Sequence, residues 1–152
     1  MITGTVNADR EPVIRIRVHD VNGHERHRAA VVDTGFTGWL TLPPDFIMAL
    51  GLFWKELGAA ILADGSQVLF DVYEASVVWD GQVVAISVDE SNSEPLVGMA
   101  LMDGFRILIE DVDGGLVQIE RIFDALGLTT HLKTGDGNPR WGKHSCLPCL
   151  SI

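Results

Sequence analysis

The sequence predicts an all-β domain, a small barrel that is closed or nearly closed. In Pro12–Asp20, apolar and polar residues alternate, which is typical of a strand with one buried face. Asn22-Gly23 favours a type I′ hairpin turn, in which both residues have positive φ, and dipeptides of the Asn-Gly or Asp-Gly type recur as turns between such segments. They stand at residues 22–23, 64–65, 80–81 and 113–114. Because only two short segments have a helical pattern, strands must form most of the fold.

The expected elements follow in a regular order. The first eleven residues are polar and mixed, and we expect a strand end or an arm. A hairpin of Pro12–Asp20 and His24–Val32 comes next, followed by the extended segment Trp39–Leu42. Pro44–Leu50 is predicted to be a short helix that ends at Gly51. The remaining expected elements are strands at Leu57–Ala63, Gln67–Val78, Gln82–Val88, Phe105–Glu110 and Leu116–Glu120, an exposed acidic loop at Asp89–Glu94 and a short helical turn at Met99–Met102.

The composition fits one globular domain. The chain has 152 residues, of which 47% are apolar, enough for one hydrophobic core. Its formal net charge of −10 argues against nucleic acid and anionic membranes as partners. The start of the chain lacks a signal-peptide pattern, and no apolar run is long enough to span a membrane. Both cysteines, Cys146 and Cys149, lie near the end of the sequence, so a reducing cytoplasm is the expected location.

One carboxylate has an unusual position. The apolar run Ala29–Val32 is typical of a buried strand and leads directly into Asp33. A carboxylate seldom ends such a strand without a partner or a task. Thr34 and Gly35 follow at once, so the chain must turn sharply where the acid stands. Two roles are open for Asp33: a functional acid, or the first residue of an Asx turn that caps its own loop.

The segment Asp33-Thr34-Gly35-Phe36-Thr37 resembles the active-site loop of the retropepsin-like aspartic proteases, in particular the bacterial and archaeal group with a D-T-G-F signature. About sixty residues later, Leu96-Val97-Gly98 resembles the hydrophobic-hydrophobic-glycine motif of the same family. The resemblance covers roughly Pro12 to Glu120. It implies a single retropepsin-like barrel domain with one or two short helices. This domain is expected at residues 1–122.

The resemblance also implies a homodimer, because the chain contains a single D-T-G and two copies would assemble one site. Each copy would supply Asp33 as the catalytic acid, Thr34 would hydrogen-bond across the dimer, and the first eleven residues would pair across the interface. Phe36 stands where viral enzymes have alanine or serine. The segment Leu96–Gly98 would support the loop. The hairpin tip Ala63-Asp64-Gly65-Ser66 would be the flap that closes over an extended peptide substrate.

The expected activity is that of an aspartic endopeptidase, which needs no metal and no cofactor. Two carboxylates about 3 Å apart share one proton, so one can activate water while the other protonates the peptide carbonyl, as is known for aspartic proteases in general. The alternative is a catalytically inactive retropepsin-like domain that serves as a peptide-binding or dimerisation module. The sequence leaves both open, because Asp33 suits either role.

Residues 123–152 are expected to be a poorly ordered C-terminal extension. From Lys133 onward the sequence is rich in glycine, lysine and proline and has no periodicity. Cys146 and Cys149 form a C-x-x-C pair, which is half of a zinc site or a redox motif, but a second ligand pair is missing. His24 and His27 lie three apart on a predicted strand and point to opposite faces, so a solvated edge is expected there rather than a metal site.

Overall fold

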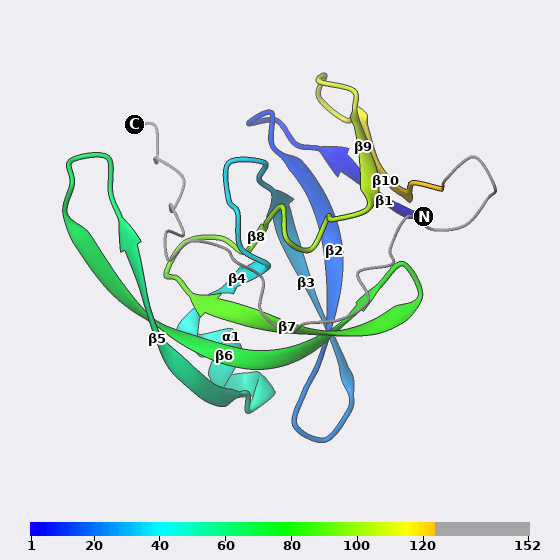
Figure 1. Ribbon diagram of the computed structural model, residues 1–152. Coiled ribbons are helices and arrows are strands. Elements are labelled where there is room, and N and C mark those ends of the chain that lie inside the picture. Colours follow the sequence, from blue (N-terminus) through cyan, green and yellow to red (C-terminus); the bar gives the residue numbers. More distant parts are fainter. Residues whose placement is uncertain (124–152) are drawn as a thin grey trace.

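The computed structural model of the chain describes residues 1–123, which form ten strands and one short helix (Figure 1). Almost all of the expected C-terminal extension, including Cys146 and Cys149, lies outside these residues. The elements are β1 (Ile2–Val6), β2 (Pro12–His19), β3 (Glu25–Val32), β4 (Leu40–Leu42), α1 (Pro44–Leu50), β5 (Phe53–Ile61), β6 (Gln67–Trp79), β7 (Gln82–Glu90), β8 (Leu96–Val97), β9 (Phe105–Ile109) and β10 (Leu116–Arg121).

The ten strands form a single sheet in the order β5-β6-β7-β4-β8-β3-β2-β1-β10-β9. A further pairing joins β6 to β2, which lie far apart in this order, through Arg17 opposite Val78 and Val18 opposite Val77. The sheet therefore curls back on itself in the manner of a barrel. The predicted all-β class is confirmed.

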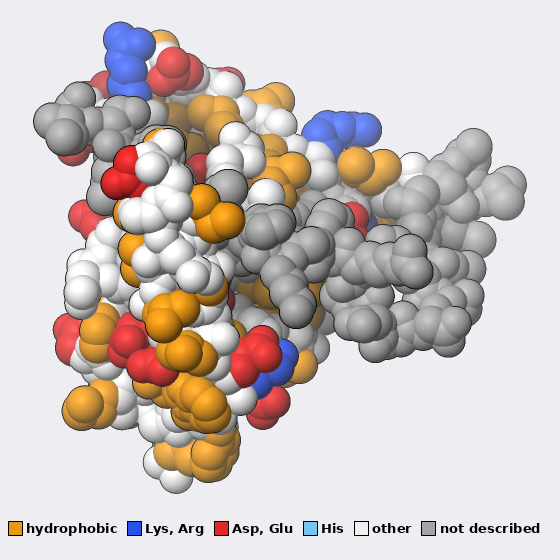
Figure 2. All heavy atoms as spheres, turned by 60° about the vertical axis from the view of Figure 1, so that its left-hand side comes forward, with side chains coloured by type: hydrophobic (Ala, Val, Ile, Leu, Met, Phe, Trp, Pro, Cys, Tyr) orange, Lys and Arg blue, Asp and Glu red, His pale blue; other side chains and the backbone are white. Residues whose placement is uncertain are grey.

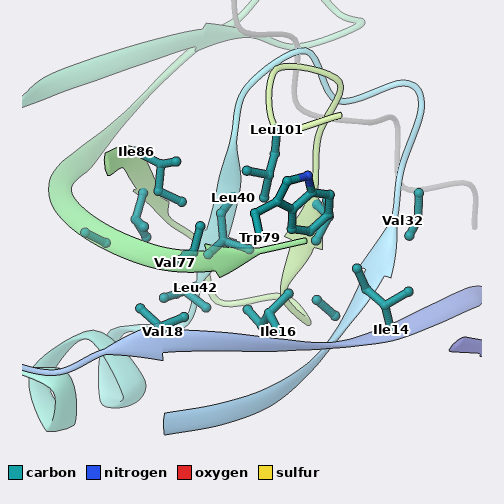
Figure 3. Packing of buried hydrophobic residues seen from close by; sticks show 14 of the residues in the cluster. Ile14, Ile16, Val18, Val32, Leu40, Leu42, Val77, Trp79, Ile86 and Leu101 are labelled. Carbon is teal, nitrogen blue, oxygen red and sulfur yellow. The ribbon is translucent and has the colours of Figure 1, made fainter. Parts of the chain in front are cut away.

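The core lies within this curled sheet. On β2, Ile14, Ile16 and Val18 are at most 3% exposed, and the residues between them are more accessible, so the predicted alternation is confirmed. Figure 3 shows Ile16 and Val18 pointing toward Leu42 and Val77. Full burial of an aliphatic side chain of this size contributes about 1.5 to 3 kcal/mol to folding, so this row is a main source of stability.

The helix α1 lies where the sequence predicted it. It ends at Gly51, which has a φ of 68° and donates its N–H to the carbonyls of Ile47 and Met48 at 3.1 Å. A residue with a side chain would be strained in this left-handed conformation, so glycine is the natural stop. Ile47 and Leu50 are buried against the sheet. Among residues 1–123, no helix is long and apolar enough to cross a membrane.

The glycine turns take different geometries. Asp80 and Gly81 both have positive φ, 48° and 79°, as a type I′ turn requires. At the first hairpin only Gly23 has positive φ, so the type I′ expectation for Asn22-Gly23 is wrong. The reason is Asp20, whose side chain accepts the N–H of Asn22 and whose carbonyl accepts the N–H of Gly23. These bonds hold the chain in a wider turn.

Three further expectations need correction. The beginning of the chain is not an arm for a partner, because β1 pairs with β2 on one edge and with β10 on the other. Met99–Met102 forms successive turns closed by bonds between residues three apart instead of a helix, and so short a segment gains too few bonds for α-helix nucleation. The polar stretch Asp89–Glu94 is not wholly a loop, because β7 continues through Glu90.

Candidate active site

Asp33 stands at the end of β3, where the chain leaves the sheet. Its backbone N–H donates to the carbonyl of Val97 at 2.9 Å, so the residue is fixed to β8 before the loop begins. One carboxylate oxygen, Oδ1, accepts the N–H of Gly35 at 2.8 Å, which is the Asx-turn bond considered for this residue. No other donor among residues 1–123 reaches the carboxylate, which is partly exposed. Asp33 is therefore held in place with acceptor capacity to spare.

The two sequence motifs that suggested the family lie side by side. β8 is inserted between β3 and β4: Val97 lies opposite Val32 in a parallel pair and opposite Leu40 in an antiparallel pair. Beyond β8 the backbone bonds continue from one segment to the other. Gly98 donates to Trp39 at 3.0 Å, Met99 to Phe36 at 2.8 Å, and Ala100 to Gly38 at 3.1 Å. The backbone of residues 97–100 is therefore hydrogen-bonded along the Asp33 loop.

Packing beneath the loop explains its glycines. Phe36 is fully buried, and its ring lies against Gly38 and Gly98. A Cβ on Gly98 would lie 2.1 Å from the carbonyl oxygen of Gly38 and 2.6 Å from Cδ1 of Phe36, so no side chain fits there. The side chain of Phe36 thus packs below the loop. Thr34 and Thr37 are exposed on the loop.

The expected flap is the hairpin of β5 and β6. Its strands pair from Phe53 opposite Glu74 to Ile61 opposite Gln67. At the tip Gly65 has a φ of 84°, and Asp64 accepts both the N–H and the hydroxyl of Ser66. Both bonds lower the pKa of Asp64, and the bond from the hydroxyl has the larger effect. In Figure 1 the tip rises on the same side of the molecule as the loop between β3 and β4.

One face of this hairpin is apolar and exposed. Cross-strand pairing places Leu57, Ile61 and Leu69 on a single face, and their exposed fractions are 57%, 43% and 59%. Trp54, which is 58% exposed, donates its indole N–H to Asp71 on the same face. Figure 2 shows hydrophobic side chains gathered on the side of the molecule that this hairpin forms. These side chains form one exposed apolar row on the hairpin.

Sequence analysis missed Asp89. It lies on β7, opposite Thr41 on β4 and Val72 on β6, and one carboxylate oxygen comes within 3.5 Å of the position that a Cβ on Gly38 would occupy. Burial, and secondly the negative charge of Glu56, raise the pKa of Asp89 from 3.8 to about 6. The alternation of Gln82–Val88 places Asp89 on the same face as Ser87, opposite to Ile86 and Val88, so the sequence pattern did not indicate its burial.

Asp33 lies outside the main hollows of the described surface. Three hollows of the described surface lie beside Arg28, beside Trp39 and beside Arg15, and Asp33 lines none of them. In residues 1–123 no group of three histidine, cysteine or acidic side chains is arranged to hold a metal ion.

The fold of this chain is similar to that of known solved structures. A retropepsin-like aspartic protease from Rickettsia conorii matches with a TM-score of 0.52 and 22% identity, over 76% of this chain and 87% of that chain. The EIAV protease, complexed with the inhibitor HBY-793, matches with a TM-score of 0.48 and 14% identity, over 65% and 91%. No family model and no curated protein matches the sequence. The first likeness shows that the chain has the retropepsin-like fold, and that prediction is confirmed.

Proposed function

We propose that the chain is an aspartic endopeptidase that acts as a homodimer, with Asp33 of each copy forming the catalytic pair. The observation that carries the proposal is the state of Asp33. In a retropepsin-like fold it sits on a loop fixed by four backbone bonds to the segment of Val97–Ala100, yet its carboxylate accepts only one hydrogen bond from residues 1–123. A loop held so firmly around an acid with free acceptor sites suits catalysis, which requires prepositioned groups.

In the proposed reaction, the two Asp33 carboxylates share one proton. The ionised one takes a proton from a water molecule, and the water oxygen attacks the carbonyl carbon of the scissile bond. The protonated one gives its proton to the carbonyl oxygen, which yields a neutral tetrahedral diol. Return of a proton to the amide nitrogen then lets the carbon–nitrogen bond break, and the second diol proton goes back to the pair. No cofactor or metal takes part.

The other residues have supporting roles in this proposal. Thr34, exposed on the loop, would hydrogen-bond to the partner's loop and align the two acids. Gly35 leaves room for a peptide backbone beside Asp33. The apolar face of β5 and β6 with Leu57 and Leu69 would cover an extended peptide, with the tip Ala63–Ser66 closing over it. The peptide would be held mainly through its backbone.

A peptide-binding or dimerisation module without catalysis is the second candidate. The bond from the N–H of Gly35 to Asp33 favours it, since an aspartate that caps its own turn would be retained without any catalytic task.

An assay with a broad peptide library between pH 4 and 7 decides between the two. The purified wild type should cleave peptides, faster at the acidic end because the pair must keep one proton. Asp33→Asn should cleave none, and the matched control Asp113→Asn, at an exposed position between β9 and β10, should remain active. Binding of peptides by both the wild type and Asp33→Asn, without cleavage by either, would replace the enzyme with the binding module.

A further inference from the structure

The hairpin of β2 and β3 carries much of the positive charge of a chain whose formal net charge is −10. Four arginines lie on its two strands: Arg15, Arg17, Arg26 and Arg28. Two of them are used within the fold. Arg26 pairs with the carboxylate of Asp20 at 3.2 Å, and the guanidinium of Arg28 lies 5.2 Å from the centre of the Phe46 ring. The other two are directed elsewhere.

Arg15 and Arg17 share the outer face of β2. The residues that alternate with them along the strand are buried in the core, so both arginines are turned outward. The register with β3 places Ala29 opposite Arg15 and His27 opposite Arg17, and both of these β3 residues are exposed. We call Arg15, Arg17 and His27 the basic strip.

A hollow of about 360 Å³ opens beside the strip, and Arg15 and Arg17 both line it. It lies at the seam of the curled sheet. The pairing of β1 with β2 ends at Ile14, and the pairing of β6 with β2 involves only Arg17 and Val18. The turn between β6 and β7 forms the opposite wall, and in Figure 1 this turn lies close to the N-terminus. Arg15 therefore stands at the gap between two strands.

The acids near the hollow leave Arg15 without a partner. Asp80, the acid among the lining residues, already binds the terminal amino group of the chain and also Arg121 at 3.6 Å. Glu25 pairs with Arg17 at 3.4 Å, but the two side chains are 38% and 40% exposed, and exposed pairs of this kind are weak. Within residues 1–123, no carboxylate lies at ion-pair distance from Arg15.

The spacing of the two arginines favours one form of anionic partner. Residues two apart on a strand are about 6.5 to 7 Å apart, which is also the repeat of alternate side chains in an extended peptide. A segment with acidic residues at alternate positions can thus offer one carboxylate to each guanidinium, whose parallel N–H groups suit a carboxylate. Nucleic acid fits less well, because a long polyanion would continue past the strip over a protein with a net charge of −10.

We infer that the basic strip binds an acidic segment of another protein in extended form. One carboxylate enters the hollow at Arg15, the next pairs with Arg17, and His27 donates an N–H beside it. Glu25 competes with the segment for Arg17. This inference does not depend on the proposed function, since Asp33 does not line the hollow.

The test uses two labelled peptides of equal composition, one with glutamate and threonine in alternation and one with all glutamates in a single block. Fluorescence anisotropy with the full chain at low salt should give a Kd below about 1 mM for the alternating peptide and a higher Kd for the block peptide. Arg15→Gln should raise the Kd of the alternating peptide about fivefold or more.

Two further variants sharpen the test. Arg106→Gln is the matched control, because it removes the same charge from an exposed arginine on β9 and should leave the Kd unchanged. Glu25→Gln should lower the Kd about twofold, because it frees Arg17 for the peptide. Repeating the titrations with Asp33→Asn excludes cleavage of the probe as a cause of any change.

Circular dichroism confirms that each variant is folded. A folded Arg15→Gln protein with the affinity of the wild type would overturn the inference, as would equal losses in Arg15→Gln and Arg106→Gln, which indicate only general attraction of charge. Equal binding of the two peptides would refute the extended form, and an unchanged Kd in Glu25→Gln would refute the part of Arg17. A single-stranded RNA that binds more tightly than the alternating peptide, and loses affinity in Arg15→Gln, would replace the acidic segment with nucleic acid.

Discussion

Asp20 and Asp33 each follow a strand and turn the chain, but their carboxylates are used in different ways. Asp20 is a saturated acceptor: Oδ1 accepts the N–H groups of Asn22 and His24 at 2.9 Å, Oδ2 accepts Nε of Arg26 at 3.2 Å, and its side chain is only 4% exposed. The carboxylate of Asp33 makes the same local bond to a backbone N–H two residues on, and accepts no other within the part of the chain that the structure describes. The comparison teaches that an Asx turn alone does not separate a structural acid from a functional one.

The hydrogen bonds of Asp20 also determine the direction in which its pKa is shifted. Burial acts to raise its pKa, but hydrogen bonds from His24, Arg26 and Asn22 outweigh that effect and hold the pKa below 3.8. A carboxylate with a lowered pKa in the folded state contributes stability above pH 4 that is lost as the pH falls. Asp20 thus stabilises the hairpin of β2 and β3 through its charge. The loop of Asp33 relies instead on backbone bonds to the segment after β8.

The largest expected effect comes from removing that support. In Gly98→Ala the new Cβ meets the backbone carbonyl of Gly38, so the Asp33 loop must shift and stability should fall by about 3 kcal/mol or more. Thermal unfolding measures the change. The matched control is Gly65→Ala at the flap tip, where nothing lies within 4 Å and only the positive φ costs about 1 kcal/mol. Equal losses in the two variants would contradict the packing argument.

A second variant should increase stability. The pKa of Asp89 rises from 3.8 to about 6 on folding, so the folded protein binds a proton more readily than the unfolded chain between these values. Stability is therefore lost as the pH rises through this range, and Asp89→Asn should restore about 2 kcal/mol at pH 7.5 and little at pH 4. Urea unfolding at both pH values measures it. A stabilisation that does not depend on pH would show that Asp89 is not the titrating group.

The smallest effects compare the two aspartates directly. In Asp20→Asn the new side chain has one oxygen where aspartate has two. Either its NH₂ group faces Arg26, or its NH₂ group faces the backbone N–H donors, and one set of donors loses its acceptor. The Tm should therefore fall by about 3 to 5 °C at pH 7. Asp33→Asn keeps an acceptor for Gly35 and should leave Tm within about 2 °C. Differential scanning calorimetry at pH 7 and pH 3 follows both. If Asp33→Asn is the more destabilising variant, Asp33 is the structural cap.

Much of the fold could be predicted from short-range patterns. The strand β2 could be predicted from the spacing of Ile14, Ile16 and Val18, and the Asp33 loop from the apolar run that leads into it. Both predictions depend only on residues close together in the sequence. The pairing of β1 on both edges could not be predicted, since it joins Ile2 to Ile119 across the whole domain. Asp89 was missed for a similar reason. Gly38, which lies near its carboxylate, and Glu56, whose charge raises its pKa, are both distant in sequence.

Mixing subunits tests the central claim that two Asp33 residues form one site. Asp33→Asn is added to an equal amount of wild type, the chains are allowed to exchange, and cleavage of a susceptible peptide is measured. If both acids are required, mixed dimers are inactive and activity falls to about half, since random pairing leaves only a quarter of the dimers fully wild type. The control is an equal amount of Val83→Lys, a variant at an exposed position of β7 that keeps Asp33, and its addition should double the activity. Unchanged activity after exchange with Asp33→Asn would mean that one Asp33 suffices, and the paired site would be wrong.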